Sequence, residues 1–94
     1  LKKIGTMRQD IYNEEQSLNQ LQQERNRITR DQDRIRENLR SVSQNSAIGK
    51  RYLTNLDKQE TQLEAILTKE DNIQASLQRK RNELSAYVNG LKLD

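Results

Sequence analysis

The sequence contains no cysteine, histidine, proline, tryptophan or phenylalanine among its 94 residues. Without cysteine and histidine the chain has no disulfides, no thiol chemistry and none of the commonest zinc ligands. No run of about 18 apolar residues is present, so the sequence holds no candidate membrane span. Hydrophobic residues make up 31% of the chain, less than a compact globular core of this size needs. These absences argue against a globular domain and against any cofactor.

Each half of the chain carries a heptad repeat, in which positions a and d are mostly apolar. Gln, Glu, Arg, Lys and Leu are abundant, which favours long helices. In each half, nine of the twelve a and d positions are apolar, and regular spacing of this kind indicates a coiled coil rather than disorder. We call these positions the seam. Its members are Ile4, Met7, Ile11, Glu14, Leu18, Leu21, Arg25, Ile28, Gln32, Ile35, Leu39 and Val42 in the first half, and Tyr52, Leu56, Gln59, Leu63, Ile66, Glu70, Ile73, Leu77, Lys80, Leu84, Tyr87 and Leu91 in the second.

The segment between the two repeats predicts a reversal of the chain. Residues 41 to 49 are rich in Ser and Asn, which favour caps and turns, and Gly49 weakens a helix interior. The heptad frame also shifts here, because counting on from Val42 would place Leu56 at position d instead of a. We therefore expect one helix over residues 2–43, a turn over residues 44–48 and a second helix over residues 49–90.

The polar residues of the seam support an antiparallel arrangement. Facing residues of a hairpin have numbers that add up to a nearly constant sum, and complementary seam residues pair at sums of 91 to 95. Half of such a sum falls near residue 46 or 47, inside the expected turn. Because buried polar groups need partners, these residues are predicted to set the register. The pairs are Glu14 with Lys80, Arg25 with Glu70, and Gln32 with Gln59.

The sequence therefore predicts an all-α fold, a long antiparallel two-helix coiled-coil hairpin that occupies residues 1–94 as one domain. The chain starts at Leu1, inside an apparently helical pattern, so we expect it to be a fragment of a larger protein. Leu53, Leu67 and Val88 lie at position e, beside the seam, and are candidate contacts for self-association into a four-helix assembly. The alternative is that long neighbouring side chains cover them.

Basic residues gather around the expected turn, where Arg and Lys outnumber Asp and Glu over residues 24 to 51. Such an arm could lie against nucleic-acid phosphates or an anionic lipid surface. The alternative, which we favour, is a solvated face laced by pairs such as Asp33–Arg36 and Glu37–Arg40. No aromatic residue interrupts the basic run to stack on bases, and the net charge is only +3.

Neighbouring carboxylates do not point to catalysis. Glu14 and Glu15, or Asp31 and Asp33, stand at spacings that point away from each other on a helix, and a two-helix hairpin offers no cleft to shift their pKa values. Gly49-Lys50 lacks the upstream glycines of a phosphate-binding loop. We expect no enzyme activity, no metal site and no cofactor.

The residues around the turn resemble a known family. They match a pattern that reads roughly EQ-x-RIR-x-NL, a short polar turn, then RYL-x-KL-x-x-QE, and the ending at residues 86–91 is similar to the family's YL-x-x-L. The matching residues are Gln32, Arg34, Ile35, Arg36, Asn38, Leu39, Arg51, Tyr52, Leu53, Leu56, Gln59 and Glu60. Residues 31 to 67 thus resemble the C-terminal helical region of mucoidy-inhibitor-A-like bacterial proteins, which carry a domain of unknown function.

This resemblance implies an exported bacterial parent with β-rich domains from which the hairpin projects, located in the periplasm or cell envelope. It carries over no catalytic residues. Because the matches cluster at the turn, we expect a structural or docking role there. The candidate contact residues are Arg36, Asn38, Arg40, Lys50, Arg51 and Tyr52.

Three functions fit the sequence. The leading one is a non-catalytic structural and protein-interaction arm, whose partners are its parent's own domains, another protein or a second copy. The second is a basic arm that binds nucleic acid, like the N-terminal hairpin of seryl-tRNA synthetase. The third is a tip-to-tip docking hairpin like those of periplasmic efflux adaptors, although Arg36, Leu39 and Ser43 match the spacing of the adaptor tip motif poorly.

Overall fold

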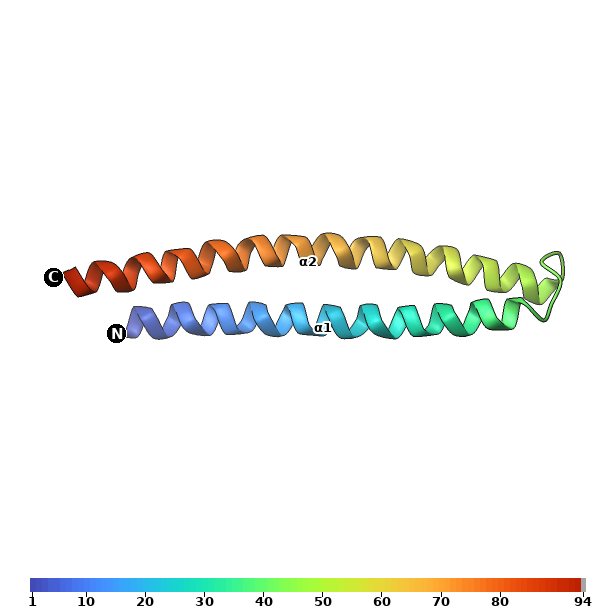
Figure 1. Ribbon diagram of the computed structural model, residues 1–94, viewed down its shortest axis with the longest axis horizontal. Coiled ribbons are helices and arrows are strands. Elements are labelled where there is room, and N and C mark those ends of the chain that lie inside the picture. The colour runs from blue at the N-terminus through green and yellow to red at the C-terminus, as the bar shows by residue number, and fades with distance from the viewer. Residues whose placement is uncertain (94) are drawn as a thin grey trace. The chain divides into compact units, whose positions relative to one another are not determined.

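The chain forms two helices, α1 (Lys2–Leu39) and α2 (Ala47–Leu93), joined by one connection (Figure 1). This computed structural model describes residues 1–93, and the final residue of the predicted domain, Asp94, lies outside the described residues. No strand is present in the described part of the chain. The prediction of an all-α helical hairpin is confirmed.

The described chain divides into two compact units, each of which contains part of both helices. Unit 1 consists of Leu1–Leu21 and Lys69–Asp94, and unit 2 consists of Gln22–Thr68 with the connection between the helices. The sequence predicted one hairpin domain without such a division.

In unit 1, early residues of α1 meet late residues of α2, so the two segments run antiparallel. The ammonium group of Lys3 stands 4.5 Å from the ring centre of Tyr87, a cation–π contact. Farther along, Lys80 and Arg81 reach Glu14 and Glu15. Two apolar seam residues are buried between the segments: Ile11 and Leu77.

In unit 2, the seam supplies the buried residues. Ile28 and Ile35 of α1 are almost wholly buried, and Ile66 of α2 is 6% exposed. Burying a side chain of this size contributes about 1.5–3 kcal/mol. The polar seam residue Gln32 is buried among them. The seam assigned from the heptads is therefore the surface along which each helix is buried.

The helices end at different residues from those expected. α1 ends at Leu39 instead of Ser43, and three successive backbone N–H groups, from Arg40 to Val42, bond the carbonyl three residues earlier. Such tighter turns are common where a helix ends. α2 begins at Ala47, two residues before the expected start. The connection thus comprises residues 40–46.

Candidate functional site

The connection between the helices is held by three hydrogen bonds to its own serines. The Oγ atom of Ser46 accepts the backbone N–H of Gly49 at 3.0 Å, and the Ser46 hydroxyl donates to the carbonyl of Ser43. The Oγ atom of Ser43 accepts the backbone N–H of Asn45 at 3.2 Å. Ser46 is therefore the N-cap of α2, because its side chain satisfies a donor that the helix leaves unpaired.

Gly49 allows the connection to fold back onto the first turn of α2. It is buried, and a Cβ atom built on it would overlap the carbonyl oxygen of Ser43 and lie 3.0 Å from the Cα atom of Gln44. We expected Gly49 to mark a weak point at the start of the second helix. The structure instead places it inside α2, where the close approach of backbone requires a residue without a side chain.

The basic side chains near the connection differ in their pairing. Arg36 contacts Asp33 at 3.4 Å and Arg40 contacts Glu37 at 3.0 Å, as the i,i+3 spacing predicts. These pairs are solvent-exposed, so each contributes little to stability.

Lys50 and Arg51 are exposed and make no ion pair with any other described residue. No Asp or Glu occurs between Glu37 and Asp57, so the positive charge here is not balanced locally. Of the remaining two candidates, Tyr52 is a half-buried residue of the seam and Asn38 is half-buried beside it. The structure thus places all six candidate contact residues near the connection, and four of them are exposed cations.

Large apolar side chains stay exposed on α2. Leu53 is 41% exposed and Leu67 is 47% exposed, both in unit 2, whereas Val88 in unit 1 is half-buried. Sequence reasoning missed Ile48, which is 45% exposed in the first turn of α2. The available signal was that Ile48 falls outside positions a, d and e of the repeat.

The two seam glutamines of unit 2, Gln32 and Gln59, do not bond to each other as expected. Each bonds to the residue next to the other in the sequence. The Nε2 atom of Gln32 donates to Oε1 of Glu60 at 2.8 Å, and the Nε2 atom of Gln59 donates to Oδ2 of Asp31 at 2.6 Å. Each side-chain amide thus bonds to a carboxylate on the other helix, one residue away from the glutamine that was its expected partner. A charge-assisted bond to a carboxylate is stronger than an amide–amide bond, which accounts for the choice of partner.

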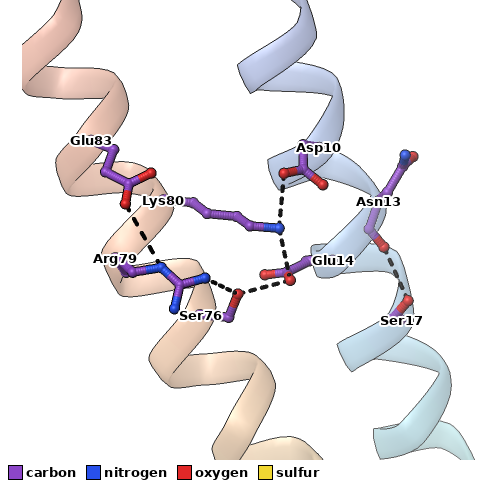
Figure 2. Close-up of polar contacts among 8 residues, drawn as sticks. All are labelled: Asp10, Asn13, Glu14, Ser17, Ser76, Arg79, Lys80 and Glu83. Carbon is purple, nitrogen blue, oxygen red and sulfur yellow. Dashed lines mark hydrogen bonds and ion pairs between the residues drawn. The ribbon is translucent and has the colours of Figure 1, made fainter.

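Unit 1 contains a polar layer centred on Lys80 (Figure 2). The ammonium group of Lys80 crosses from α2 to α1 and stands 2.8 Å from Asp10 and 3.0 Å from Glu14. The hydroxyl of Ser76 donates to the same Glu14 oxygen at 2.8 Å. The structure thus brings Glu14 and Lys80 together, and it adds Asp10 and Ser76, which the sequence analysis did not single out.

These contacts shift the pKa values of the groups involved. The hydrogen bond from Lys80 lowers the pKa of Glu14, and the hydrogen bonds to Asp10 and Glu14 raise the pKa of Lys80. In unit 2, the hydrogen bond from Arg34 lowers the pKa of Asp31, and that from Gln59 adds to the effect. Each charged form is therefore favoured by the folded helix pair, as expected for structural ion pairs.

The third predicted pair falls in two units. Arg25 is half-buried in unit 2, and Glu70 is 5% exposed in unit 1. Their pairing stays a prediction.

In the part of the chain that the structure describes, no group of three or more Asp or Glu residues is placed to hold a metal ion. Over the same residues, neither helix has a stretch apolar and long enough to cross a membrane.

No family model, curated protein or solved structure significantly matches this chain. Its candidate sites therefore rest on the geometry alone: the cations around the connection with an exposed isoleucine in the first turn of α2, and the two exposed leucines of unit 2.

Replacing Gly49 by Ala should destabilise the hairpin, because the new methyl group overlaps the Ser43 carbonyl. We expect a loss of about 1–3 kcal/mol, typical of overpacking. Gly90→Ala is the matched control, since nothing lies within 4 Å of a Cβ atom there and Ala favours a helix by up to about 1 kcal/mol. Urea denaturation of both variants measures the difference, and equal stabilities would contradict the packing described.

The Lys80 layer should make stability depend on pH at both extremes. The lowered pKa of Glu14 stabilises the fold above its usual value of 4.5, and this stabilisation is lost as the pH falls through the lowered value. The raised pKa of Lys80 stabilises the fold below its usual value of 10.5 and is lost as the pH rises through the raised value.

Lys80→Met, which keeps the apolar stem of the side chain, should therefore lower the Tm by several degrees at pH 7. The difference from the unmodified chain should shrink as the pH falls through the lowered pKa of Glu14, where the carboxylate takes up a proton. Thermal unfolding followed by circular dichroism measures this. Lys58→Met, at an exposed position of α2, is the control and should change the Tm little; an equal effect of both variants would refute a special role of Lys80.

Proposed function

We propose that this chain is a non-catalytic arm of a larger protein, a helical hairpin with a structural and protein-interaction role. The observation that carries the proposal is that large apolar side chains stay exposed on α2 after the seam has been filled. Leu53 and Leu67 are each more than two-fifths exposed, whereas Leu56 and Leu63, within one helical turn of them, are half-buried in the seam. Exposed apolar patches rimmed by polar residues are typical of surfaces that bind another protein.

The environment of the titratable groups supports the non-catalytic part of the proposal. Among the described residues, the groups with shifted pKa values are Glu14, Asp31 and Lys80, and each is hydrogen-bonded to a charged or polar partner within the helix pair. Charged groups paired in this way stabilise a fold, whereas a catalytic acid or base needs an environment that sets its pKa near the working pH.

The resemblance to mucoidy-inhibitor-A-like proteins extends the proposal to the parent. It would be an exported bacterial protein, in the periplasm or cell envelope, whose β-rich domains carry this hairpin. The partners would be the parent's own domains or another protein.

The cations near the connection favour a second candidate, in which the connection itself is the contact surface. Lys50 and Arg51 are exposed without an ion pair among the described residues, and Ile48 beside them is exposed as well. A partner for this surface would be anionic: an acidic protein surface, as in adaptor-type docking, or a nucleic acid, as in a tRNA-binding arm.

Site-specific photo-crosslinking of the full-length parent in its own cells tests these proposals. A photoreactive residue at Glu64 reports on the exposed face of α2 in unit 2, one at Gln44 on the connection, and one at Gln23 on the opposite side of α1 from the seam. The leading proposal expects a discrete protein adduct from Glu64, weakened when Leu53 and Leu67 are both changed to Ser, and none from Gln23.

Adducts from Gln44 alone would favour docking through the connection, and their sensitivity to nuclease would identify nucleic acid as the partner. The absence of any adduct above background at all three positions would overturn the role as an interaction arm.

A further inference from the structure

We infer that one face of unit 2 binds a second copy of this chain, side by side, so that α1 of each copy lies against α2 of the other with both connections at the same end. This inference rests on the proposed role as an interaction arm and names the partner. The face, which we call the e face, consists of Leu53, Glu60 and Leu67 on α2 together with Thr29 and Arg36 on α1.

The hydrogen bonds across the seam define which residues share this face. Gln32 reaches Glu60 on one flank of the helix pair, and Gln59 reaches Asp31 on the other. Leu53 and Leu67 are each seven residues from Glu60, which is close to two helical turns, so they lie on the Glu60 flank.

On α1, Arg36 is one turn beyond Gln32 and lies on the same flank, and Thr29 is seven residues before Arg36. Both are exposed. The e face therefore has a leucine-bearing edge on α2 and a polar edge with one cation on α1.

The apolar part of this face is larger than its two exposed leucines. Leu56 and Leu63 belong to the seam but are only half-buried, and they lie within one turn of Leu53 and Leu67 respectively. Together the four leucines form a band along α2 that a single hairpin leaves partly in contact with water. Covering it is favourable at about 25 cal/mol per Å² of apolar surface.

Charge determines how a second copy can cover this band. Three carboxylates border it on α2, those of Asp57, Glu60 and Glu64, and neither Asp57 nor Glu64 makes an ion pair with a described residue. An arrangement that places α2 against α2 of the other copy would bring these carboxylates together, and like charges in contact oppose association.

The alternative arrangement places opposite charges together. The two seam hydrogen bonds join residues whose numbers add up to 90 and 92, so Arg36 lies level with residue 55, between Leu53 and Asp57. If α1 of one copy lies against α2 of the other about a twofold axis parallel to the helices, Arg36 meets Asp57 of the second copy. Its present contact with Asp33 is solvent-exposed and 3.4 Å long, so exchanging it costs little.

The same twofold axis makes every contact occur twice. Leu53 and Leu67 then pack against the stems of polar residues on the e face of the other copy, and the aliphatic part of Arg36 covers Leu53. Val88, the third residue expected to contact a second copy, is half-buried in unit 1 and is not part of this face.

A charge-swap experiment on the hairpin tests the inference. Sedimentation equilibrium should show a reversible dimer of the unmodified chain. Arg36→Glu and Asp57→Arg should each weaken the dimer about tenfold, because each change places two pairs of like charges in contact. A mixture of the two variants should recover the affinity, since the mixed dimer keeps one Arg36–Asp57 contact unchanged and, in the other, brings together the two substituted positions, which carry opposite charges.

Two further variants check the face. Leu53→Ser combined with Leu67→Ser should weaken the dimer at least about tenfold, whereas Arg30→Glu, at an exposed position of α1, should leave it unchanged. Circular dichroism should show the same helix content for every variant, since all of the changed residues are exposed.

A monomer at all concentrations up to about 1 mM, a range that covers weak complexes, would overturn the inference. So would a dimer that is indifferent to both charge changes, or one that the mixture does not restore. Because the crosslinking experiment reports on any protein partner, a monomeric hairpin that still forms adducts from Glu64 would refute only this inference and leave the proposed function standing.

Discussion

Each helix of this chain can bury one narrow stripe of side chains, and the rest of the structure depends on the mutual burial of these two stripes. With 31% hydrophobic residues and only three aromatics, the chain has too few apolar side chains to form a second buried layer. Ile28 and Ile35 are almost wholly buried because they face the other helix in unit 2, whereas Ile48, an identical side chain outside the stripe, is 45% exposed. Among these isoleucines of unit 2, position relative to the seam, and not hydrophobicity alone, decides what is buried.

Polar side chains buried in so narrow a stripe destabilise the fold unless they form hydrogen bonds or ion pairs. The partners come from beside the seam as well as from within it. Lys80 is held by Glu14 of the seam and by Asp10 outside it, and the amide of Gln59 is held by Asp31. Moving one helix by a heptad would leave these groups facing apolar side chains, so the polar contacts favour one register over others of similar apolar burial.

The sequence was sufficient for the helices and the seam because these follow from a period of seven residues that tertiary structure has little freedom to override. It was less informative about the connection. The cap formed by Ser46 and the close approach at Gly49 depend on the path of the backbone, which no periodicity encodes. The partners of Gln32 and Gln59 differ by one residue from those expected, because a carboxylate nearby is a stronger acceptor than an amide opposite. The exposed Ile48 could have been found from the repeat, because an apolar residue outside positions a, d and e is not expected to be buried between the helices. The heptad repeat reports on contacts between the two helices of this chain, so it carries little information about the partner that the arm binds.

The pairing of the two stripes can be tested directly because the chain has no cysteine of its own. Ile28→Cys combined with Leu63→Cys places two thiols opposite each other in unit 2, one turn from the facing positions Gln32 and Gln59. This pair should oxidise rapidly to an intramolecular disulfide, since a disulfide needs Cα atoms within about 7 Å. Ile28→Cys with Leu56→Cys, shifted by one heptad, should stay reduced under the same conditions. Preferential oxidation of the shifted pair, or equal oxidation of both, would contradict the register on which this account depends.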